Sequence, residues 1–141
     1  MRSLEDVSAD LERPVNGAPV TAQADRLLRA GEDTLVQWNL GRGFTPTDKT
    51  REGFRLLALH RQGAKGEPSF NACRETCREL VYHYNLVTRE PDHPGVAKRL
   101  EMMRFVAMHL FLFVHGKIEV EGLGEFCCAS RPLRTGAAQQ P

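Results

Sequence analysis

The chain has 141 residues, a formal net charge of +1, and apolar residues make up 41% of it. This length is typical of one domain that can bury a real core, and the near-neutral charge gives no global attraction to nucleic acid or to an anionic membrane. The first residues contain no apolar signal segment. Four cysteines without such a segment indicate reduced thiols, so we expect a cytoplasmic protein.

Residues 1–19 are predicted to form an N-terminal helical arm and a linker. Ser3 and Asp6 resemble a capping box at the start of a helix that ends before Pro14, and PVNGAP is typical of a linker. The apolar residues on one side of this helix are Leu4, Val7 and Leu11. Because residues 1–18 carry little apolar surface, we expect the arm to become ordered only when it docks on another surface.

Three further segments have the periodicity of amphipathic helices. They are residues 21–40, a segment that begins at Thr45 and ends by Gly63, and residues 69–88. In the second segment, Thr45 fits an N-cap and Pro46 fits the first helical position, which is why we expect the helix to begin there.

A fourth helix over residues 94–117 is predicted to be the central one. Its first half is amphipathic, whereas residues 105–114 contain a single polar side chain, His109. A helix that is apolar all round is typically buried all round, and this run is too short to span a membrane. We therefore expect the rest of the chain to enclose it, or else a second subunit or partner to cover what remains.

The pattern changes after Lys117. Ile118 and Val120 alternate with glutamates, which predicts a short strand, and residues 125–129 could return as the second strand of a hairpin. Residues 130–141 have little to bury and are predicted to be a disordered tail. The fold class expected is mostly α: a four-helix bundle-like domain over residues 20–129, with the N-terminal arm and a short C-terminal hairpin or extended tail.

The cysteines and one histidine suggest a possible metal site. Cys73 and Cys77 lie four residues apart on one helical face, and with His109 they could bind a transition metal in a sensor or carrier. Cys127 and Cys128 could add thiolates. However, the spacing is not that of a zinc site, and the helical cysteines lie on an apolar stripe, where cysteine packs as a small hydrophobe. We therefore expect no cofactor and a neutral His109 in the core, and keep the transition metal as the alternative.

Arginine pairs suggest a second possible site. The pairs, each at i,i+4 spacing on a neighbouring helix, are Arg51 with Arg55 and Arg74 with Arg78. Four guanidinium groups could converge there into an anion-binding or nucleic-acid-binding patch. Glutamates such as Glu52 and Glu75 intervene, so a solvated face of mixed charge is the simpler interpretation, and nucleic-acid binding is not expected.

No residues have the spacing of a known catalytic motif, so the chain is not expected to be an enzyme. A dockable arm and tail accompany a surplus of apolar residues. Together these features predict a small accessory or regulatory protein that acts by binding a protein partner or by self-association.

Overall fold

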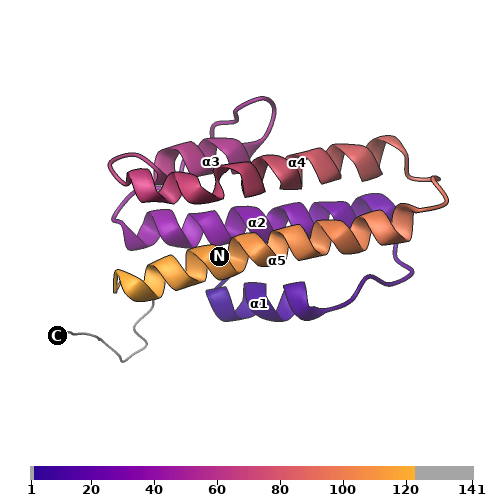
Figure 1. Ribbon diagram of the computed structural model, residues 1–141, viewed down its shortest axis with the longest axis horizontal. Coiled ribbons are helices and arrows are strands. Elements are labelled where there is room, and N and C mark those ends of the chain that lie inside the picture. The colour runs from indigo at the N-terminus through magenta and orange to yellow at the C-terminus, as the bar shows by residue number, and fades with distance from the viewer. Residues whose placement is uncertain (1, 123–141) are drawn as a thin grey trace.

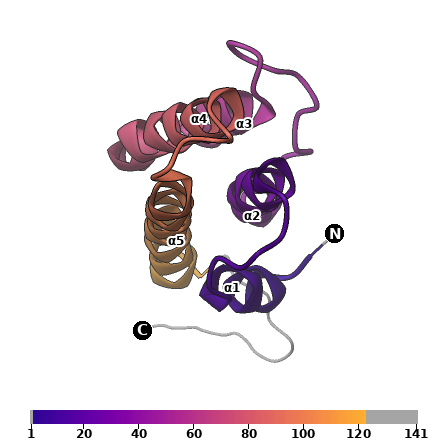
Figure 2. The ribbon, with the colours of Figure 1, turned by 90° about the vertical axis from the view of Figure 1, so that its right-hand side faces the viewer.

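The computed structural model describes residues 2–122, which form five α-helices, one 3₁₀ helix and no strand. The elements are α1 (Leu4–Glu12), α2 (Val20–Gly41), α3 (Arg55–Gly63), η1 (Pro68–Cys73), α4 (Arg74–Arg89) and α5 (Val96–Val120). In Figure 1, α2 and α5 run side by side along the long axis, with α3 and α4 on one side and α1 on the other. The end view in Figure 2 shows the same three layers. The predicted mostly α, bundle-like fold is confirmed.

Helix α2 packs against each of the other α-helices, whereas the sequence predicted this central place for the helix over residues 94–117. Its predicted span, residues 21–40, is confirmed to within one residue at each end. Gly31 explains how closely its neighbours approach. A Cβ atom at that position would lie 2.7 Å from Leu80 Cδ2 and 3.2 Å from Leu56 Cδ1. The missing side chain therefore lets α3 and α4 pack directly on α2.

The predicted helix start at Thr45 is wrong, because α3 begins ten residues later, at Arg55. Residues 45–50 are polar apart from Pro46 and offer no apolar stripe to bury, so the side chain of Gln62 holds them as a loop instead: it accepts from Thr47 N at 2.9 Å and donates to Thr45 O at 2.8 Å. The loop then closes in a tight turn at Glu52 and Gly53, whose φ angles are 54° and 85°.

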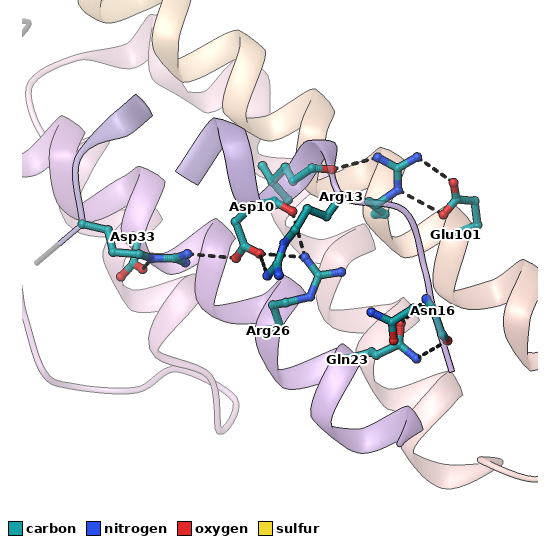
Figure 3. A network of polar contacts seen from close by, with 10 residues as sticks. Asp10, Arg13, Asn16, Gln23, Arg26, Asp33 and Glu101 are labelled. Atoms are coloured by element: carbon teal, nitrogen blue, oxygen red, sulfur yellow. Dashed lines mark hydrogen bonds and ion pairs between the residues drawn. The ribbon is translucent and has the colours of Figure 1, made fainter. Parts of the chain in front are cut away.

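Helix α1 packs on α2 and α5 through Val7 and Leu11, which are fully buried. Beside them, Asp10 accepts hydrogen bonds from Arg2 and Arg26, both at 2.8 Å (Figure 3). The arm therefore needs no other molecule to dock on. The low apolar content of the arm had predicted that it becomes ordered only on binding another surface. That prediction is wrong, because ion pairs to Asp10 supply part of the contact between the arm and the bundle.

The linker between α1 and α2 is also fixed to the bundle. The side chain of Gln23 accepts from Asn16 N at 3.1 Å and donates to Asn16 O at 3.0 Å (Figure 3). It also donates to Ala18 O at 2.8 Å. These bonds satisfy backbone groups that a linker would otherwise present to water, so residues 16–18 follow a defined path into α2.

Helix α5 differs from the prediction at its C-terminal end and on its outer face. Ile118 and Val120 belong to the helix, so the strand predicted for them is wrong, and residues 125–141 lie outside the described residues. Ile118 is buried on the face that α5 turns to the core, which favours continuing the helix. None of the helices within residues 2–122 is long and apolar enough to cross a membrane.

Candidate functional site

A cleft with a volume of about 1040 Å³ opens between the loop over residues 44–54, α3 and the first turns of α4. We call it the basic cleft. Its charged lining side chains are all cationic: Lys49, Arg51, Arg61, Lys65, Arg74 and Arg78. Buried side chains at its base include Leu57, His60 and Cys77. The cleft thus concentrates positive charge in a protein whose net charge is only +1.

The structure brings three of the four arginines singled out in the sequence into this cleft, Arg51, Arg74 and Arg78. Arg55 does not line it. Its Nε atom donates to Thr47 O at 2.9 Å, and its guanidinium lies 3.4 Å from Asp48, so this arginine holds the neighbouring loop.

Most cations of the basic cleft have no acidic partner among the described residues. Arg78 pairs with Glu52 at 3.1 Å, whereas Lys49, Arg51, Arg61, Lys65 and Arg74 make no ion pair in that part of the chain. The mixed-charge interpretation expected glutamates to neutralise this surface. Glu52 does so for one arginine only, and Glu75 does not line the cleft.

Lys49, Arg61 and Lys65 were not predicted as site residues, because the sequence pattern used was a pair of arginines at i,i+4 spacing. These three residues come from a loop, a helix and a turn, so no single periodicity connects them. A usable signal was present, since basic side chains outnumber acidic ones over residues 49–78. That charge excess marks the segment whose fold forms the cleft.

His60 and two thiols form a buried cluster beneath the cleft. His60 is buried, and the centroid of its ring lies 5.3 Å from that of Phe70. His60 Nε2 lies 3.1 Å from Phe70 O and carries the proton, because a carbonyl oxygen only accepts. The i+3 and i+4 spacing of His60 from Leu57 and Leu56 could have predicted this burial.

The thiols of Cys73 and Cys77 affect each other's pKa. A hydrogen bond from Cys77 lowers the pKa of Cys73 to about 6; burial opposes this shift, and His60 reinforces it. The same hydrogen bond, together with burial, raises the pKa of Cys77. The two sulfur atoms therefore shift each other's pKa in opposite directions, and Cys73 is the more acidic thiol of the pair.

We expect the substitution Cys77→Ala to raise the pKa of Cys73, because it removes the largest cause of the lowering. The measurement is a pH titration of thiolate ultraviolet absorbance, taken as the difference between Cys77→Ala and the Cys73→Ala, Cys77→Ala double variant. This difference removes the contributions of Cys127 and Cys128. A midpoint that stays near the wild-type value would show that His60, and not Cys77, controls Cys73.

The structure does not bring together the three residues considered as metal ligands. Cys73 and Cys77 are buried, whereas His109 lies on the exposed face of α5, which corrects the expectation of a core histidine. Within residues 2–122, no group of three or more histidine, cysteine, aspartate or glutamate side chains is placed to hold a metal ion. Cys127 and Cys128 lie outside the described residues.

The exposed face of α5 is the second notable surface. Met102, Phe105 and Leu112 are 50%, 54% and 60% exposed, and His109 lies between them. Within residues 2–122, the chain does not enclose this part of the helix as expected. These four residues, which we call the α5 seam, follow one another at intervals of three, four and three, which is the spacing of a coiled-coil seam.

The chain matches no protein-family model, and no similar curated protein or solved structure was found. The basic cleft and the α5 seam are therefore the features that bear on function.

Proposed function

We propose that this protein is a small accessory or regulatory protein that acts by self-association, with α5 of one copy packed against α5 of a second copy. The observation that supports this proposal is the α5 seam: three large apolar side chains at coiled-coil spacing, each at least half exposed. Exposed apolar residues are common singly, but a regular row of them along one helix is typical of an interface.

Charges at the two ends of the seam favour a second copy in the antiparallel direction. Continuing the same spacing leads to Lys98 at one end and to Glu119 at the other, and both side chains are exposed. The two residues are about 31 Å apart along the helix axis. In an antiparallel pair, Lys98 of each copy comes within about one turn of Glu119 of the other, and a two-fold axis repeats this contact.

The central part of the seam also suits a symmetric pair. With the two-fold axis between Phe105 and His109, Phe105 of one copy packs on His109 of the other, and Met102 packs on Leu112. Each apolar side chain then faces a partner, as in the alternating layers of an antiparallel coiled coil. A parallel pair would instead place like charges together at both ends.

We expect Leu112→Glu to raise the dissociation constant of the dimer by about 100-fold or more, because it places two charges in the interface and removes two buried leucines. Sedimentation equilibrium over a range of concentrations measures this constant. The control is Ala22→Glu, which introduces the same charge at an exposed position of α2 and should leave association unchanged.

A charge exchange tests the direction of packing. Lys98→Glu should weaken the dimer, and adding Glu119→Lys should restore it, because the exchanged charges again face each other across the two-fold axis. A wild-type chain that stays monomeric at all concentrations would contradict the proposal. So would a dimer that Leu112→Glu leaves intact.

A further inference from the structure

We propose that the basic cleft is a binding site for a small, multiply phosphorylated anion. This site lies on the loop over residues 44–54, α3 and α4, away from the α5 seam, so the inference is independent of the proposed self-association. Five of its six cations have no acidic partner in the described part of the chain, which leaves their hydrogen-bond donors available to a ligand.

The charge arrangement is the first argument. Six cations around one hollow repel each other, and within residues 2–122 only Arg78 forms an ion pair, with Glu52. A bound polyanion relieves this repulsion. Four of the six are arginines, whose planar donor fork matches two oxygens of one phosphate group.

The uncharged lining is the second argument. Thr47, Thr50 and Asn71 place hydroxyl and amide groups around the same hollow, and groups of this kind complete the coordination of phosphate oxygens. The volume of about 1040 Å³ is that of a small-ligand site at the upper end of the usual range.

The cleft lining contains no exposed aromatic side chain, because its one aromatic ring, that of His60, is buried, and this narrows the class of ligand. Single-stranded nucleic acid is held by bases stacked on aromatic side chains, and the lining of this cleft contains no phenylalanine, tyrosine or tryptophan. The cleft therefore recognises the phosphate chain and has no platform for a base. Inorganic polyphosphate and the triphosphate of a nucleotide share this chemistry, and the experiment separates them.

Isothermal titration calorimetry of the full chain with inorganic tripolyphosphate is the test. We expect saturable binding of one ligand per chain, about tenfold or more tighter than that of orthophosphate, because several phosphates engage several cations. A nucleoside triphosphate should bind within about threefold of tripolyphosphate if no base is recognised. Affinity that depends strongly on the base would overturn the assignment.

Two variants locate the site. Arg61→Gln and Arg74→Gln should each weaken tripolyphosphate binding by about tenfold, because each removes charge-assisted hydrogen bonds to the ligand. Both arginines are exposed, so neither substitution should disturb the fold. The control is Arg89→Gln, the same change at the other end of α4, about 22 Å from Arg74 along the helix. It should change the affinity by less than about twofold, because salt screens charges at that distance.

The remaining outcomes overturn the proposal. No saturable binding of tripolyphosphate would do so directly, as would equal losses in Arg74→Gln and Arg89→Gln. A short nucleic-acid duplex that binds more tightly than tripolyphosphate, and that loses affinity in the same two cleft variants, would identify the surface as a nucleic-acid interface instead.

Discussion

Replacing Trp38 with alanine is expected to lower the free energy of unfolding by about 3–5 kcal/mol, the range for removing a fully buried tryptophan. Its ring stacks on Phe70 with centroids 4.4 Å apart and planes inclined by 3°. Its indole nitrogen donates to Gly63 O at 2.9 Å. The alanine variant would lose both the contact between α2 and η1 through Phe70 and the hydrogen bond between α2 and the end of α3 through Gly63.

The matched control is Trp38→Phe, which keeps an aromatic ring against Phe70 and loses the indole donor. The carbonyl oxygen of Gly63 would still accept from the guanidinium of Arg42 at 2.8 Å, so it would not be left unsatisfied. We therefore expect this variant to lose less than half as much stability as Trp38→Ala. Urea unfolding followed by circular dichroism measures both losses. Equal losses would show that the hydrogen bond, and not the packed volume, stabilises this region.

The long helices were predictable because their apolar stripes are long. Residues 20–41 present a stripe over six turns, and the predicted and observed ends of α2 agree to within one residue. The start of α3 was not predictable in this way. Thr45 and Pro46 have the chemistry of a helix start, but no apolar residue follows within a turn to hold a helix there. The capping residues alone did not start a helix here, because the residues after them offer no apolar side chain to bury against the bundle.

Burial on α5 was harder to predict, because composition does not say which part of an apolar helix has neighbours. Leu110 and Val114 are buried and Leu112 is exposed, although all three are aliphatic. The number of helices available decides this. Helix α5 packs against α1, α2 and α4, and within the described part of the chain its outer side has no neighbouring helix. This lack of a neighbouring helix is the physical reason for proposing that a second copy covers the outer side of α5.

The basic cleft was predictable only in part, because its cations come from separate elements. Arg74 and Arg78 were recognised by their helical spacing, and the structure places both in the cleft. Lys49 and Lys65 lie in connections whose path depends on hydrogen bonds such as those made by Gln62. A sequence pattern does not specify such tertiary contacts, so the hollow itself could not be foreseen.

Asp10 is expected to make the stability of the protein depend on pH below about pH 4. Its carboxylate is 8% exposed. Burial by itself raises its pKa, but hydrogen bonds from Arg13, Arg2 and Arg26 outweigh burial and lower the pKa from 3.8 to about 2. A carboxyl whose pKa is lower in the folded state stabilises that state at every pH above its unfolded value. The contribution disappears as the pH falls toward the folded value.

The shift corresponds to about 2 kcal/mol of unfolding free energy at neutral pH. Asp10→Asn should remove it, so we expect the variant to be less stable by about that amount near pH 7 and equal to wild type near pH 2. Asp6→Asn, the same change at an exposed position of α1, should cost less than about 1 kcal/mol. Urea unfolding of the three proteins across this pH range measures the differences. If the stability difference between Asp10→Asn and wild type stays constant down to about pH 2, Asp10 stabilises the fold by its packing and not by its charge. A charge effect must disappear once the carboxyl is protonated.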